Sequence, residues 1–237
     1  MRAAILVTAL ALGACGSADG QEGEASGERG QRGFEVGAFD RISLAGSHDV
    51  VVAVGGAPSI RAEGDARALE RLDIRVEDGQ LRIGSRRSDS WLGRGHRGVT
   101  VHVTVPALAA AGVAGSGAMR IDRVEGQRFE ASLAGSGDLD VGALRVEQAR
   151  FAIAGSGNIR AAGTAANAAL SIAGSGDADL SGLESRAAEV SVMGSGDARL
   201  RATETASVSV MGSGDVTVEG GARCTVDKRG SGDVHCG

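Results

Sequence analysis

The chain has 237 residues, of which 25 are basic and 30 are acidic, giving a formal net charge of -5. These charges are interspersed and form no basic face, which argues against nucleic-acid binding, because affinity for phosphate needs clustered Lys and Arg. With 39 Gly, two Pro, four Phe, one Trp and no Tyr, the core must consist of Val, Ile, Leu and Ala. Such small side chains suit a repetitive fold, in which each repeat buries a thin layer against the next.

The first residues have the composition of a secretory signal. After Arg2, the run Ala3–Leu12 is uncharged and apolar, but it is shorter than the roughly 20 residues that span a membrane. The run ends in the letters LGAC, which resemble the lipobox of bacterial lipoproteins. This resemblance implies lipidation of Cys15, with an ordinary cleavage site beside an incidental cysteine as the alternative. Gly16, where an Asp would cause inner-membrane retention, implies the outer membrane if the cell has one.

The next segment, residues 16–33, is rich in Gly and charged residues and has no apolar periodicity. This composition is typical of a flexible, hydrated tether. We therefore divide the chain into a signal peptide (1–14), a lipidated cysteine with a flexible tether (15–33) and one β-solenoid domain (34–237). The domain has an irregular first part (34–111) and a regular second part (112–237).

Several elements are predicted in the irregular part. Residues around GSHDVVVAV alternate as in a strand, and the apolar residues of Asp65–Leu72 stand at helical spacing, which predicts one short helix. The sequence around Asp78-Gly79 predicts a hairpin that turns at this dipeptide. Ser85–Gly98 is a polar, Arg-rich loop, and Val99–Pro106 alternates as a strand does and ends at a proline.

The regular part repeats the tripeptide GSG. Successive copies are spaced 20, 20, 19, 20, 18 and 18 residues apart, and they begin at Gly115, Gly135, Gly155, Gly174, Gly194, Gly212 and Gly230. Apolar residues recur two and four positions before each first glycine and six positions after it, as in strands with one buried face. One such unit cannot bury its apolar face alone, so the copies must stack about 4.8 Å apart. The sequence predicts an all-β solenoid with GSG-turn repeats of 18–20 residues.

Charged residues also recur at fixed places after each turn. Asp or Asn usually stands three residues after the first glycine, where its side chain can bond its own backbone. The residue five positions after the first glycine lies on the outer face, and runs Arg120, Asp140, Arg160, Asp179, Arg199, Thr217 and His235. If the coils stack in register, opposite charges lie about 4.8 Å apart and form an alternating ladder.

The order of motifs resembles a known family. The similarity lies in the order of FDRISLAGSHDVVV, VEDGQLRI and VTVHVTVP, followed by successive AGSGD turns. Over about residues 34–237 the chain is similar to the putative auto-transporter adhesin head domain, called the head GIN domain. The resemblance implies a right-handed parallel β-helix-like, all-β fold on an envelope-exposed protein, and it carries no catalytic residues. The chain departs from the family pattern at His48, at Ala118 and in a cysteine pair near residue 237.

The repeated Ser and Asp do not predict a catalytic or metal site. AGSGD is not the GxSxG elbow of hydrolases, and the same serine recurs in every turn. Calcium-binding β-rolls carry a ligand turn every nine residues, twice as often as this chain, and the histidines lack metal-ligand spacing. We expect no catalytic residue, no metal and no cofactor. A polysaccharide-active enzyme is the alternative, because parallel β-helices host that chemistry, and carboxylates clustered on one face would favour it.

Two further sites are predicted. The loop SRRSDSWLGRGHRG is the densest basic segment, and we name Trp91, Arg86, Arg87 and Arg94 as a possible contact for an acidic glycan or an envelope protein; Trp91 could instead cover a core edge. Cys224 and Cys236 occupy inward columns on either side of the final turn, which predicts a disulfide in an exported protein, with two buried thiols as the alternative.

The combined expectation is a non-catalytic lipoprotein of the cell envelope. A lipid on Cys15 would anchor it in a membrane, by the lipobox resemblance the outer one. Its rigid solenoid would serve adhesion or envelope interaction, with a glycan or an envelope protein as the partner.

Overall fold

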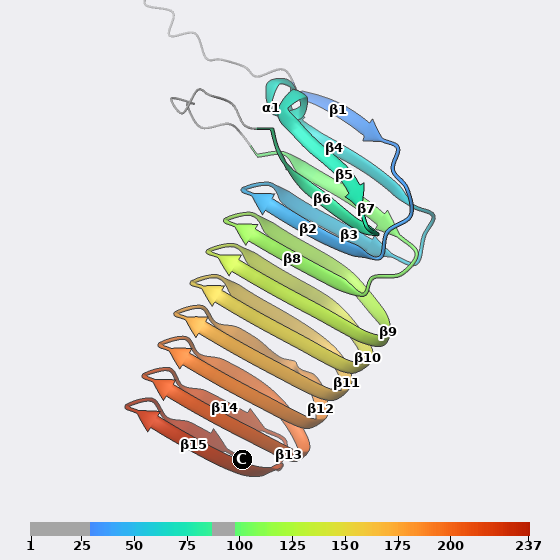
Figure 1. Ribbon diagram of the computed structural model, residues 1–237. Helices are drawn as coiled ribbons and strands as arrows, with labels where there is room; N and C mark the ends of the chain where they lie inside the picture. Colours follow the sequence, from blue (N-terminus) through green and yellow to red (C-terminus); the bar gives the residue numbers. More distant parts are fainter. Residues whose placement is uncertain (1–28, 87–97) are drawn as a thin grey trace, which may run out of the picture.

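The computed structural model describes residues 29–86 and 98–237 and confirms the β-solenoid (Figure 1). Two sheets face each other across one core. Sheet I begins with β1 (Arg29–Phe34), β4 (Ser59–Asp65), β7 (Thr100–Val105) and β3 (Asp49–Val54). Sheet II begins with β5 (Leu72–Glu77), β6 (Gln80–Ser85), β2 (Arg41–Gly46) and β8 (Ala110–Gly115).

Long strands then pass through both sheets, one coil each. They are β9 (Ala118–Gly135), β10 (Asp138–Gly155), β11 (Asn158–Gly174), β12 (Ala178–Gly194) and β13 (Ala198–Gly212). β14 (Val216–Glu219) and β16 (Val234–Cys236) continue sheet I, and β15 (Arg223–Gly230) continues sheet II. The pairing between successive coils is parallel throughout. None of the helices in the described residues is long and apolar enough to cross a membrane.

The core is built from the inward columns that the sequence predicts. Phe151 and Ile153, which precede the turn at Gly155, are each 1% exposed, and Val141 on the other sheet is also 1% exposed. Each coil therefore contributes a thin apolar layer from both sheets, and burying such layers between coils is what stabilises a solenoid.

The GSG turns lie on top of one another along one edge of the stack. The carbonyl of Gly135 accepts hydrogen bonds from the backbone N–H of Ser156 and of Gly157, at 2.8 and 3.0 Å. A Cβ added to Gly157 would lie 2.2 Å from the oxygen of Gly137 in the coil before it. Glycine is therefore required by the close approach of neighbouring coils, in addition to its conformational freedom.

His48 departs from the repeat without disturbing this stack. On the N-terminal side of its coil, β2 pairs with β6 and β3 pairs with β7. Nε2 of His48 lies 2.7 Å from the hydroxyl of Ser85, the last residue of β6. Burial lowers the pKa of His48, against the effect of Asp49.

Differences in coil length are absorbed at the opposite edge. Register shifts between successive coils fall at Val141/Leu144, at Arg160/Gly163 and between Leu180 and Ala187. No shift occurs between β9 and β10, because each of these coils spans 20 residues from one GSG turn to the next. The GSG edge therefore stays regular although the repeat length varies from 18 to 20 residues.

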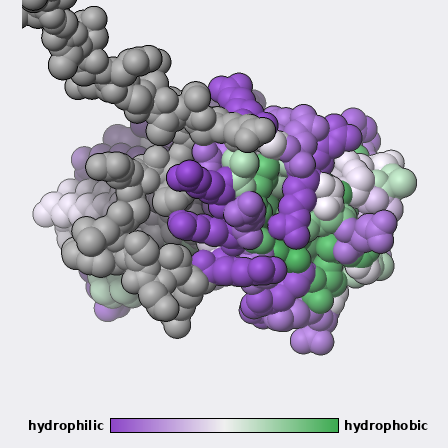
Figure 2. All heavy atoms as spheres, turned by 90° about the horizontal axis from the view of Figure 1, so that it is seen from above, coloured by the Kyte–Doolittle hydropathy of each residue, from purple (hydrophilic) through white to green (hydrophobic). Residues whose placement is uncertain are grey.

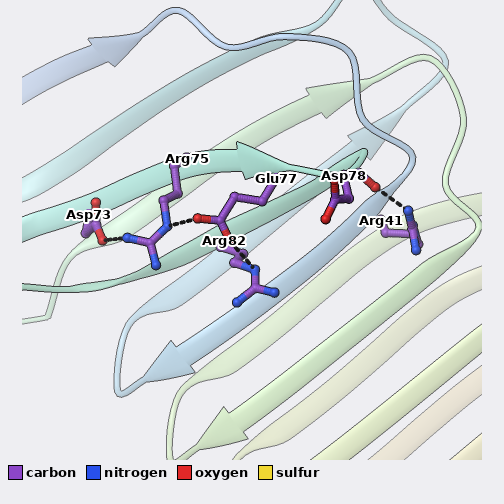
Figure 3. Close-up of polar contacts among 6 residues, drawn as sticks. All are labelled: Arg41, Asp73, Arg75, Glu77, Asp78 and Arg82. Atoms are coloured by element: carbon purple, nitrogen blue, oxygen red, sulfur yellow. Dashed lines mark hydrogen bonds and ion pairs between the residues drawn. The ribbon is translucent and has the colours of Figure 1, made fainter.

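The N-terminal end of the stack is closed by antiparallel elements. α1 (Ala66–Arg71), with Asp65 as its N-cap, confirms the predicted helix and packs against β1 and β4. β5 and β6 form the predicted hairpin, in which Arg75 lies opposite Arg82. The carboxylate of Glu77 bridges both guanidinium groups at 2.8 and 3.1 Å, which offsets their repulsion (Figure 3). Hydrophilic side chains cover much of this end, with apolar side chains visible between them (Figure 2).

Two expectations need correction here. Residues 29–33, which we assigned to the flexible tether, belong to β1, because this strand pairs with β4 over Arg29–Phe34. A disulfide joins Cys224 to Cys236 in the structure, but Cys236 is exposed rather than buried. Within the described chain no coil follows β15 and β16, so their inward side chains lack a covering layer, and Val226 is 45% exposed.

Candidate interaction surface

Most residues of the predicted ligand contact lie outside the described chain. Trp91, Arg87 and Arg94 lie outside the described residues, as does Cys15, the predicted lipidation site. Arg86 is described: it is exposed at the end of β6, and its backbone N–H donates to the carbonyl of Arg71 at 2.9 Å. The contact at this loop therefore stays a prediction.

The outer face of sheet I carries the alternating charges in register. Asp140 pairs with Arg120 on one side and with Arg160 on the other, and Asp179 pairs with Arg160 and Arg199. Asp179 also accepts a hydrogen bond from the Ser181 hydroxyl at 2.6 Å. This bond lowers the pKa of Asp179, and the nearby Arg199 and Arg160 act in the same direction, while burial opposes them.

This ladder yields a prediction about stability. Asp140→Arg places three arginines on neighbouring coils and should lower the free energy of unfolding more than Asp140→Ala does, by a few tenths of a kcal/mol to about 1 kcal/mol. Urea denaturation in low salt measures the difference, and added salt should reduce it because the ladder is exposed. Equal unfolding midpoints for the two variants would show that these charges do not interact.

The acidic residues after each turn link one coil to the next. Oδ1 of Asp177 accepts from the backbone N–H of Asp197 at 2.9 Å, and Oδ1 of Asp197 accepts from that of Asp215 at 2.9 Å. We expected these side chains to bond their own backbone, but because the turns lie in register, they accept from the backbone of the next coil instead. Among the described residues no group of three or more His, Cys, Asp or Glu is placed to hold a metal ion.

The outer face of sheet II differs from that of sheet I, because two columns next to the GSG edge carry no charge over six coils. These columns, here called the uncharged strip, are Ala114, Ala134, Ala154, Ala173, Met193 and Met211, and Gly112, Ser132, Ala152, Ser171, Ser191 and Ser209. The exposed turn serines, such as Ser136 and Ser156, lie beside it. Coil spacing makes the strip about 24 Å long from the first coil to the last.

Two methionines make the strip partly apolar. Met193 is 58% exposed and Met211 is 49% exposed, the highest values among the large hydrophobic side chains of the described chain. Flexible thioether side chains are common on surfaces that bind other molecules. An uncharged, partly apolar surface also costs less to desolvate than a charged one, so the strip is suited to contact with a partner.

The sequence pattern did not predict this strip, because apolar periodicity marks only the inward columns and charge alternation marks only the fifth position after each glycine. The signal was available: one and three residues before each first glycine, the charges seen elsewhere on the outer faces are replaced by Ala, Ser, Gly or Met. In the final turn the same two columns hold Arg229 and Asp227, so the strip ends there.

Comparisons with known proteins agree with this architecture. The family model "Putative auto-transporter adhesin, head GIN domain" matches residues 38–222. A structure described as a putative adhesin from Bacteroides fragilis is 22% identical with a TM-score of 0.82, covering 89% of this chain and 98% of its own. A putative lipid binding protein from Parabacteroides distasonis is 22% identical with a TM-score of 0.73, covering 90% and 98%.

A third structure, of a putative adhesin from Parabacteroides merdae, is 18% identical with a TM-score of 0.72, covering 90% of this chain and 97% of its own. At these identities the structures support the fold alone. No curated protein matches the chain.

Proposed function

Because the chain belongs to the family of the putative auto-transporter adhesin head GIN domain, we propose that it is a lipid-anchored envelope protein whose solenoid adheres to a partner through the uncharged strip. The observation that carries this proposal is the contrast between the outer faces of the two sheets. Sheet I has alternating charges, whereas sheet II presents an uncharged strip with two exposed methionines. The family supports an adhesion role and an envelope location.

The rigidity of the body also supports adhesion. Parallel pairing runs from β3 and β2 to β16 and β15, and every GSG turn is hydrogen-bonded to the turn before it. Such a stack holds its surface side chains in fixed rows, so little conformational entropy is lost when a partner binds.

The membrane anchor can be tested by itself. Cys15→Ser removes the thiol that would carry the lipid and should move the protein from the detergent phase to the aqueous phase of a Triton X-114 partition. The body should remain folded, because Cys15 precedes the first strand, β1. If the variant still partitions with detergent, the lipoprotein assignment is wrong.

The adhesive role is tested by screening the anchorless Cys15→Ser chain on a glycan array and in pull-downs from envelope fractions. We expect saturable binding to at least one glycan or envelope component. The absence of saturable binding in both formats would contradict the proposal.

A polysaccharide-active enzyme remains the second candidate because Asp177, Asp197 and Asp215 lie in one row. Their repeated bonds to backbone N–H groups give them a structural role in each coil, which favours the first candidate. Incubation of the same chain with the glycans that it binds distinguishes the two, because an enzyme would shorten them.

A further inference from the structure

A shallow depression of about 320 Å³ lies in the outer face of sheet II, beside the uncharged strip and farther from the GSG edge. It extends over β10, β11 and β12. The outward residues that line it are Gln148, Arg150, Asn167, Ala169, Ala187 and Glu189, and the buried Ala149, Ala168 and Ala188 lie between them. This volume lies at the lower end of the range for small-molecule sites.

The depression exists because alanine interrupts two rows of longer side chains. Ala169 lies in register between Arg150 on one side and Glu189 on the other. Arg150 and Glu189 are thus two coils, about 9.6 Å, apart at their backbones. In the neighbouring row, Ala187 follows Asn167 in the same way. Alanine methyl groups therefore form an apolar floor, with polar side chains around it.

The polar groups around this floor have unused hydrogen-bonding capacity. The side chains of Arg150, Asn167 and Glu189 make no hydrogen bond or ion pair with any other residue in the described ranges. Gln148 uses its carbonyl oxygen to accept from Arg128 at 3.3 Å, which leaves its amide hydrogens available. The depression thus offers guanidinium and amide donors and carboxylate and amide acceptors, with one positive and one negative charge.

We propose that this depression binds one pyranose residue of a glycan. A pyranose presents hydroxyl groups, each a donor and an acceptor, around the rim of a ring whose faces carry C–H groups. The alanine floor fits the ring face, Glu189 and Arg150 are placed to bond hydroxyls at opposite rims, and the two amides add further bonds. Because the opposite charges balance, the site suits a neutral sugar. This assignment rests on the proposed adhesive function and names its ligand class.

The test uses the anchorless Cys15→Ser chain and saturation-transfer NMR with methyl pyranosides of glucose, galactose, mannose and N-acetylglucosamine. The variant Ala169→Leu fills the floor and leaves every polar group in place. The matched control, Ala110→Leu, lies in the same column of sheet II on β8, where it opposes Glu130 of β9. We expect saturation transfer from the protein to at least one pyranoside. The affinity for that pyranoside should be about tenfold or more weaker in Ala169→Leu than in wild type, and unchanged in Ala110→Leu.

Glu189→Gln should weaken binding, while Glu184→Gln, on the same strand but outside the depression, should leave it unchanged. Absence of transfer to all four pyranosides, or equal transfer in wild type and Ala169→Leu, would overturn the assignment. Stronger transfer to the zwitterion glycylglycine than to any sugar would also overturn it, because the separated charges would then select a peptide. A negative result with these isolated sugars would overturn the pyranose site alone. Adhesion through the uncharged strip is tested separately, by the glycan array and the pull-downs.

Discussion

Gly155→Ala should lower the free energy of unfolding by about 4 kcal/mol, a large effect for a single methyl group. Gly155 has φ +131°, a conformation that residues with a Cβ rarely adopt, and an added Cβ would lie 2.4 Å from the oxygen of Gly135. Both effects act at once, because the coil before it cannot move away without breaking the turn-to-turn hydrogen bonds. Urea denaturation followed by circular dichroism measures the loss.

Gly126→Ala is the matched control for this prediction. Gly126 lies in β9, its φ is not in the left-handed region, and nothing lies within 4 Å of an added Cβ. We expect its unfolding free energy to stay within about 1 kcal/mol of wild type. A Gly155→Ala variant as stable as Gly126→Ala would show that the close stacking of GSG turns does not determine the fold.

Reducing the Cys224–Cys236 disulfide should destabilise the final coil by about 3 kcal/mol, because the bond closes a short loop around the last turn. This coil has little burial of its own. Lys228 pairs in register with Val210 of the preceding coil, so a cation stands where earlier coils have an apolar side chain. Since coils contact only their neighbours, amide hydrogen exchange should accelerate in β15 and β16 and much less in β10.

The pairing itself is checked by mass spectrometry of non-reduced peptides from protein recovered from the envelope. We expect a peptide that links Cys224 to Cys236 and disappears on reduction. The double variant Cys224→Ser/Cys236→Ser provides the control, because its exchange rates should not respond to reductant. Two free thiols in the recovered protein would contradict the assignment.

Much of the fold could be predicted because two independent patterns, the period-2 alternation and the repeated GSG turn, indicate the same alignment of the coils. Ile153 and Phe151 fall in the core for this reason, and the short helix after Asp65 follows from helical spacing. The order of β6, β2 and β8 in sheet II could not be predicted, because long-range pairing in the irregular part leaves no mark on local periodicity.

The candidate site was harder to predict than the core. A buried column is recognised by its repeated apolar residues. The uncharged strip is recognised by the absence of charged residues, which can be seen only when the coils are aligned. The depression at Ala169 depends on neighbours from two other coils, Arg150 and Glu189. The exposure of Cys236 was missed because column position alone does not say whether another coil covers it.

The most direct test of the account is binding of the anchorless chain to the envelope component or glycan retained in the screen, compared between two double variants. Ala154→Glu/Ala173→Glu places two charges on adjacent coils of the uncharged strip. Ala143→Glu/Ala162→Glu places the same charges near the edge opposite the GSG turns. We expect the first variant to lose binding and the second to bind as wild type does. Undiminished binding by the strip variant would contradict it.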